Sequence, residues 1–197
     1  MKMQTFTAKI QGRTALLSHR FSERSEIAVG KNTRRMGVDE TITPRAVAKE
    51  SAYILPTGEH YHPGAAFGRL IAHAAGNHKL KSSRKSAKYL IPAAVLVLDE
   101  AVVIRNGDGQ TPVKDFEVDS RPVVIPATKG RVMRHRPRYD CWSMTLNIRV
   151  DTDLIPESFV HQLLIEGGQQ VGIGDFRPEK FGPFGTFSVT SWEPAKE

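Results

Sequence analysis

A glycine-rich stretch over residues 171–192 constrains the fold more than any other part of the sequence. It carries two cations, Arg177 and Lys180, and its end alternates apolar and polar residues, as a half-buried strand does. The four glycines are Gly172, Gly174, Gly182 and Gly185. Because glycine accepts positive φ and lets another backbone approach closely, the pattern predicts a helix exit, a loop whose amides face phosphate groups, and a final strand. The alternative is a loop whose glycines only solve turn geometry, since the spacing matches neither the dinucleotide fingerprint nor the phosphate loop.

The charge balance favours a polyanionic partner. The 197-residue chain carries 28 lysines and arginines against 21 acids, a formal net charge of +7. This length is typical of a single domain. The single cysteine, Cys141, excludes an intramolecular disulfide and favours an intracellular setting. No apolar run is long enough for a signal peptide or a membrane span, so we expect a cytoplasmic protein without a membrane partner.

Hydrophobic periodicity predicts six core elements. Strands are expected over residues 5–10, 93–104 (one strand or a strand pair), 142–150 and 186–192, and helices over residues 63–76 and 156–170. A shorter helix is expected over residues 44–53, where Thr43 can cap the helix that Pro44 begins. The order strand, helix, strand, strand, helix, strand predicts an α+β fold with a ferredoxin-like (RRM-like) split β-α-β core. We therefore expect one RRM-like domain over residues 1–197, with insertions at about 22–54, 77–92 and 108–140.

Two of these insertions contain runs of basic residues without an acid. The first run comprises Lys79, Lys81, Arg84, Lys85 and Lys88, and the second comprises Arg121, Lys129, Arg131, Arg134, Arg136 and Arg138. Apolar residues between the cations of the second run indicate a β-ribbon or extended arm, with Tyr139 and Trp142 at its exit. Aromatic rings beside arginines can stack on unpaired bases while guanidinium groups hold phosphates, so both runs are candidate nucleic-acid contacts. A solvated charged surface is the alternative reading of each run.

Three segments resemble a known family. They are residues 9–17 (KIQGRTALL), residues 55–69 (LPTGEHYHPGAAFGR) and the glycine-rich stretch, in this order along the chain. Together they resemble the RAMP superfamily of CRISPR-associated proteins, and specifically its Cas-seven-type backbone subunits. The resemblance implies an RRM-like core whose copies oligomerise along a guide RNA. Carried over by position, the RNA-facing candidates are His19, Arg20, Arg69, Gly172, Gly174, Arg177 and Lys180.

The expected function is binding of single-stranded RNA, of the guide or crRNA kind, through its backbone within a CRISPR-like ribonucleoprotein of antiviral defence. The partners implied are RNA, further copies of the chain and other CRISPR subunits. Single-stranded DNA stays open, because phosphate and stacking contacts serve both.

Two alternative functions remain from the sequence. One is a metal-independent endoribonuclease of the same superfamily, for which His19, His135 and Asp39 are the candidate catalytic residues, since histidine changes protonation near neutral pH. The other is a phage-encoded structural mimic or inhibitor of a CRISPR complex. No cofactor is expected, and no metal either, because no cysteine pair or acidic cluster completes a site at His60 and His62.

Overall fold

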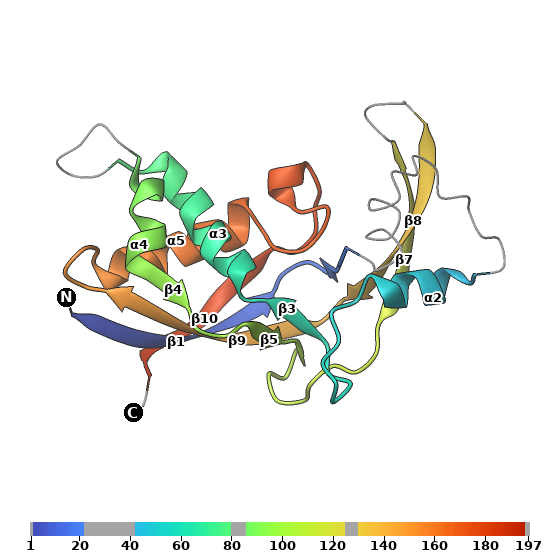
Figure 1. Ribbon diagram of the computed structural model, residues 1–197, viewed down its shortest axis with the longest axis horizontal. Helices are drawn as coiled ribbons and strands as arrows, with labels where there is room; N and C mark the ends of the chain where they lie inside the picture. Colours follow the sequence, from blue (N-terminus) through green and yellow to red (C-terminus); the bar gives the residue numbers. More distant parts are fainter. Residues whose placement is uncertain (1, 22–41, 80–85, 125–129, 196–197) are drawn as a thin grey trace, which may run out of the picture.

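The computed structural model describes residues 2–21, 42–79, 86–124 and 130–195, and shows a mixed α+β protein built on antiparallel sheets. The main sheet has five strands in the order β10-β1-β9-β4, with β6 also paired to β9. These strands are β1 (Met3–Gly12), β4 (Val95–Val97), β6 (Arg105–Asn106), β9 (Trp142–Asp151) and β10 (Phe187–Pro194). Strands β1 and β9 run beside each other for nearly their whole length and form the centre of the molecule (Figure 1).

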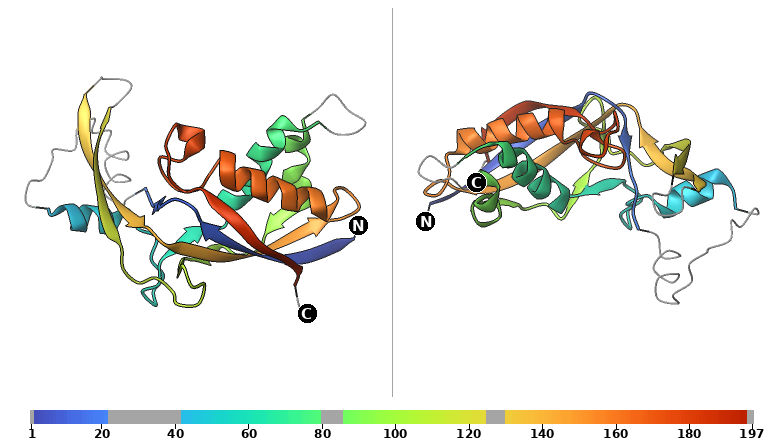
Figure 2. Two further views of the ribbon diagram at one scale, coloured as in Figure 1. Left: turned by 180° about the vertical axis from the view of Figure 1, so that it is seen from behind. Right: turned by 90° about the horizontal axis from the view of Figure 1, so that it is seen from above.

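Two helices cover one face of the main sheet. Helix α3 (Ala65–Ala74) and helix α5 (Glu157–Gln170) lie on the same side, with α5 along β10 (Figure 2). The alternation of β1 explains this arrangement, because Phe6, Ala8 and Ile10 are buried under the helices while Lys9 is exposed on the other face. An antiparallel sheet with one packed face gives this pattern.

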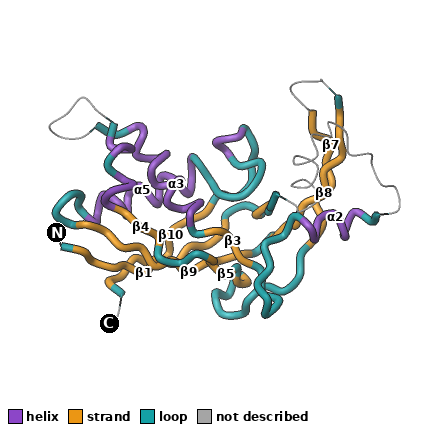
Figure 3. The backbone as a smooth tube through the Cα atoms, viewed as in Figure 1, coloured by secondary structure: helices purple, strands orange, loops and turns teal. Residues whose placement is uncertain are grey.

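A second sheet forms an arm at one end of the molecule. Strand β8 (Arg131–Tyr139) pairs with β7 (Glu117–Val124) and with the short β2 (Leu16–Leu17). We call β7 and β8 the ribbon; it projects from the main sheet beside helix α2 (Pro44–Glu50), as Figures 1 and 3 show. A two-stranded sheet of β3 (Tyr61–Pro63) and β5 (Ala101–Val103) completes the strands. The described residues also contain four short helical segments, η1 (Ala75–Asn77), η2 (Ala87–Tyr89), α4 (Ile91–Ala94) and η3 (Pro178–Lys180).

Helix α5 continues through Gly167 and Gly168 to Gln170, as predicted. A Cβ at Gly167 would lie 2.2 Å from Leu70 Cδ2, and a Cβ at Gly168 would lie 2.7 Å from Phe187 Cε2. Glycine is therefore present here because α3 and β10 pack tightly against α5.

Most predicted core elements are confirmed by β1, α3, β9, α5 and β10. The apolar run over residues 93–104 proves to be a strand pair, but β4 and β5 belong to different sheets and the first two residues belong to α4. Arg105 and Asn106, which follow this run, form β6 against β9. Helix α2 ends at Glu50, and its first turn is capped as predicted, with the Ala46 amide donating to Thr43 Oγ1 at 3.3 Å. None of the described helices is long and apolar enough to span a membrane.

Candidate nucleic-acid interface

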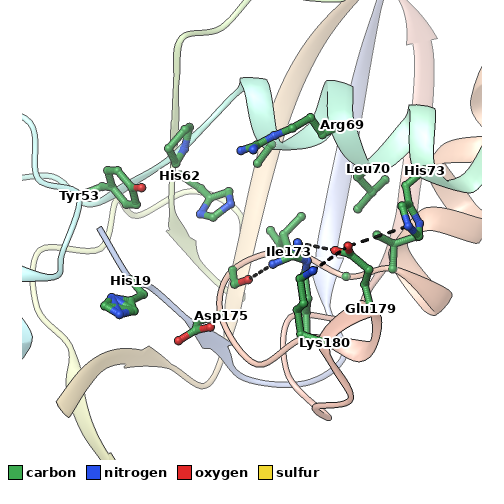
Figure 4. A pocket seen from close by; sticks show the side chains of 16 residues that line it. His19, Tyr53, His62, Arg69, Leu70, His73, Ile173, Asp175, Glu179 and Lys180 are labelled. Atoms are coloured by element: carbon green, nitrogen blue, oxygen red, sulfur yellow. Dashed lines mark hydrogen bonds and ion pairs between the residues drawn. The ribbon is translucent and has the colours of Figure 1, made fainter. Parts of the chain in front are cut away.

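A cavity of about 590 Å³ lies between α3, the segment that leaves β2 and the loop that follows α5. It gathers six of the residues assigned to RNA contact from separate parts of the sequence, His19, Arg69, Gly172, Gly174, Arg177 and Lys180. Figure 4 shows Arg69 reaching over the cavity from α3, with His62 and Tyr53 on one side and Lys180 on the other. The packing of α3 against α5 positions this site, because the glycine loop begins where α5 ends.

Close backbone contacts shape the glycine loop. Gly174 and Gly185 have φ of +76° and +71°. A Cβ at Gly174 would lie 2.3 Å from the Leu17 carbonyl oxygen, and a Cβ at Gly185 would lie 1.8 Å from the Ile173 carbonyl oxygen. The prediction of a loop whose amides face phosphate needs correction, because three of the four glycine amides donate within the protein. The Gly172 amide donates to Gly167 O at 2.9 Å, the Gly182 amide to Arg177 O at 3.0 Å and the Gly185 amide to Ala15 O at 2.8 Å. Among the described residues no hydrogen bond engages the Gly174 amide.

The Glu179 carboxylate forms ion pairs with both cations of the loop. Glu179 pairs with Arg177 through a very short contact, with Lys180 Nζ at 3.3 Å and with His73 Nε2 at 3.9 Å. Burial acts to raise the pKa of Glu179, but Arg177 and Lys180 together outweigh it and hold this pKa below its ordinary value. Arg177 also donates from Nη1 to Gly174 O at 2.9 Å, which ties its side chain to the loop. Sequence reasoning did not single out Glu179, although its place between the two predicted cations was a usable signal.

Burial lowers the pKa of two histidines that line the cavity, His62 and His19. His62 is 5 % exposed, and burial, with Arg177 and Arg69 nearby, lowers its pKa to about 4. The pKa of His19 is also lowered, chiefly because surrounding protein atoms desolvate its cationic form, although Asp175 opposes this effect. His60 is buried and its Nδ1 lies 2.8 Å from the Tyr139 hydroxyl. No group of three or more His, Cys, Asp or Glu side chains in the described part of the chain is placed to hold a metal ion.

The ribbon confirms the predicted β-structure, but its arginines divide into two kinds. Arg136 is only 4 % exposed, and its Nε lies 2.6 Å from Asp175 Oδ2, so its guanidinium does not face solvent. Its assignment to RNA is therefore wrong as a surface contact. Arg121 and Arg138 are half-buried and pair with Asp119 and Asp140, at 2.8 and 2.7 Å. The second basic run thus meets acids that lie outside it in the sequence.

The remaining arginines of the ribbon stay available to a ligand. Arg131 and Arg134 are exposed on β8, and Arg134 Nη1 donates to His19 Nε2 at 3.1 Å. This contact joins the ribbon to the edge of the cavity. His135 lies on the same strand, with Nδ1 2.7 Å from Ser120 Oγ.

The two aromatic residues expected to stack on bases are not available. Tyr139 and Trp142 are 4 % and 0 % exposed. The Trp142 indole donates to Thr14 O at 2.8 Å. Both rings are part of the core beneath the ribbon, so the stacking role assigned to them is wrong.

The other predicted contacts lie outside the cavity or outside the described residues. Lys79 and Lys88 are exposed beyond the C-terminal end of α3, and Lys88 Nζ lies 5.0 Å from the centroid of the Tyr89 ring. Arg20 is exposed beside the cavity, near enough to Tyr53 to influence its pKa. Lys81, Arg84, Lys85, Lys129 and Asp39 fall outside the described residues.

No protein-family model matches the sequence, and no curated protein does. Among solved structures, a chain of the cryo-EM structure of the Type III-B Cmr-beta bound to cognate target RNA matches 99% of this chain with a TM-score of 0.60 and 11% identity. The match covers 61% of that longer chain. The crystal structure of Cmr6 from Pyrococcus furiosus matches 96% of this chain and 99% of its own, at 10% identity and a TM-score of 0.47, which supports no inference. The match to the Cmr-beta chain shows a shared fold, and the resemblance found in the sequence agrees with it at that level.

Proposed function

We propose that the chain binds single-stranded RNA through its phosphate backbone, with the strand running through the cavity and past the exposed arginines of the ribbon. The observation that carries the proposal is the convergence on one cavity of residues assigned to RNA from distant parts of the sequence. Arg69 comes from α3, Arg177 and Lys180 come from the glycine loop, and Arg134 reaches the cavity edge through His19. Cations spaced along a groove are the arrangement that tracks a phosphate backbone.

The fold supports the same proposal. A chain of similar fold occurs in a structure bound to cognate target RNA. The sheet order β10-β1-β9-β4, with α3 and α5 on one face, supports a ferredoxin-like, RRM-like core. We infer further that the chain acts as a subunit of a CRISPR-like ribonucleoprotein and oligomerises along the RNA.

Binding isotherms at several salt concentrations test this function. Single-stranded RNA and DNA of one sequence are titrated with the parent protein, with Arg69→Gln and with Lys180→Gln. Each variant should bind RNA more weakly, and the slope of log affinity against log salt should flatten by about 0.7 for each lost phosphate contact. Lys114→Gln removes an exposed cation outside the cavity and should match the parent. Unchanged affinity and slope in both cavity variants would contradict the proposal.

A further inference from the structure

Phe181 is the most exposed large apolar side chain among the described residues, at 98 %. Its backbone also lies in the left-handed region, with φ of +58°. An aromatic residue in that region is uncommon, because its Cβ crowds the following carbonyl group at a cost of about 1–2 kcal/mol. The chain therefore carries a strained backbone at a residue whose ring gains almost no packing within its own chain. Strain of this kind concentrates at ligand-binding positions.

The turn that holds Phe181 is well determined by its contacts. The Phe181 amide donates to Pro178 O at 2.9 Å, and the next amide, of Gly182, donates to Arg177 O at 3.0 Å. A Cβ at Gly182 would lie 1.8 Å from Phe176 O, so the two ends of the turn cross in close contact. The ring is consequently displayed at the end of η3, which projects from the body between α3 and the ribbon (Figure 1).

The phenylalanines of this loop differ in exposure, since Phe176 is 36 % exposed whereas Phe184 is buried. Phe184 is 8 % exposed, and its ring lies 6.1 Å from that of Phe176 and 4.6 Å from the Arg121 guanidinium. The loop thus has apolar surface on which a ring can pack, and Phe181 is turned away from it. Its immediate neighbour Lys180 lines the cavity, with a side chain 59% exposed.

We propose that Phe181 stacks on an unpaired base of the RNA strand whose backbone occupies the cavity; this inference rests on the proposed function. An exposed ring next to a cation is the combination that binds single strands, because the ring meets the base while the ammonium group meets the adjacent phosphate. The neighbouring cations favour this occupant over an apolar pocket of a protein partner. Phe181 supplies the stacking surface that buried Tyr139 and Trp142 cannot.

The test is a coupling experiment with two RNAs. One is a single-stranded oligonucleotide, and the other has the same length with abasic positions, so that ribose and phosphate remain but stacking surfaces are missing. Phe181→Leu should weaken binding of the base-containing RNA about fivefold or more, and should leave binding of the abasic RNA within about twofold of the parent. Phe181→Trp should restore tight binding, with indole fluorescence quenched by the base-containing RNA alone.

The stability of the variant Phe181→Gly shows whether the exposed ring has a structural role. Phe181→Gly removes both the ring and the left-handed strain, so its Tm should equal or exceed that of the parent while its affinity for base-containing RNA falls as in Phe181→Leu. A structural role for the ring would instead lower the Tm.

Four other outcomes would contradict the inference. Equal RNA affinity of Phe181→Leu and the parent would overturn stacking and leave the proposed function standing. Equal losses on both RNAs would mean that the substitution disturbs the loop, which also overturns stacking. Loss of RNA-free self-association in Phe181→Leu, measured by light scattering, would assign the ring to a protein contact instead. Failure of the parent to bind any RNA would overturn the proposed function and this inference with it.

Discussion

Arg136 Nε lies 2.6 Å from Asp175 Oδ2, and this ion pair joins the ribbon to the glycine loop. Asp119 stands on the other side of the same guanidinium, 3.9 Å from Arg136 Nη1. Arg121 supplies a second cation to Asp119, 2.8 Å away. Two arginines and two carboxylates therefore share one largely buried network, which sets how the ribbon meets the wall of the cavity.

Replacing Arg136 tests this network. Arg136→Gln should lower the free energy of unfolding by about 3 kcal/mol, because it removes the buried cation that compensates Asp175 and Asp119. Urea unfolding measures the change. Arg131→Gln, at an exposed position of the same strand, should stay within about 0.5 kcal/mol of the parent and serves as the control. If the two variants unfold alike, Arg136 is not a structural residue, and its original assignment to RNA becomes tenable again.

Removing the charge of Glu179 should raise the affinity for RNA. Glu179→Gln removes a negative charge that repels phosphate and occupies both Arg177 and Lys180. Arg177 keeps its bond to Gly174 O, so the loop should hold its shape. One unit charge at about 4 Å contributes about 1 kcal/mol in water, so RNA should bind about fivefold more tightly.

The control for this gain is Glu100→Gln, an exposed acid outside the cavity that changes the net charge equally. Affinities are compared at one salt concentration. Weaker binding by Glu179→Gln would show that the carboxylate orients Arg177 for RNA rather than opposing it.

Strands β1, β9 and β10 and helices α3 and α5 were predictable because each has its own periodicity. Strand β9 alternates without interruption from Trp142 onward, and α3 carries Phe67, Leu70 and Ile71 at helical spacing, so local pattern and final packing agree. The family resemblance, carried over by position, named His19, Arg69 and Lys180 as RNA-facing candidates, and the structure places all three around one cavity.

The errors share a different origin. Whether an arginine or an aromatic ring faces solvent depends on partners that sequence spacing does not reveal. Arg136 looked free because its own run contains no acid, yet Asp175 reaches it from the glycine loop. Tyr139 and Trp142 looked exposed beside cations, but the junction of ribbon and main sheet needs large rings, and both are buried there. The exposure of Phe181 depends on how the turn after η3 is placed in the fold, which the sequence pattern does not show.

Because His62 is buried, we expect the protein to lose stability in mild acid. His62 has a pKa of about 4 when folded and an ordinary value of 6.5, so the unfolded chain binds a proton at pH values where the folded chain does not. The free energy of unfolding should therefore fall as the pH is lowered from about 6.5 towards 4, by about 2 kcal/mol between pH 7 and pH 5. The lowered pKa values of His19 and His60 act in the same direction.

Urea unfolding of the parent and of His62→Gln at pH 7, 6 and 5 checks the assignment. The variant should show a shallower dependence on pH, whatever its stability at pH 7. Parallel profiles for the two proteins would place the acid sensitivity elsewhere.

The glycine loop gives the last prediction. Gly174→Ala should lower the free energy of unfolding by about 2–4 kcal/mol, because φ is +76° and the new Cβ would lie 2.3 Å from Leu17 O. Gly58→Ala is the matched control, since its φ of +86° imposes similar strain with no atom within 4 Å, and it should lose only about 1 kcal/mol. The variant Gly68→Ala, inside α3 with open space around the new Cβ, should raise the free energy of unfolding by up to about 1 kcal/mol.

RNA affinity measured on each folded variant then shows whether Gly174 only shapes the loop or also contacts the RNA. A Gly174→Ala protein that is as stable as Gly58→Ala would contradict the close approach to Leu17, and a destabilised one that still binds RNA as the parent does would remove Gly174 from the interface.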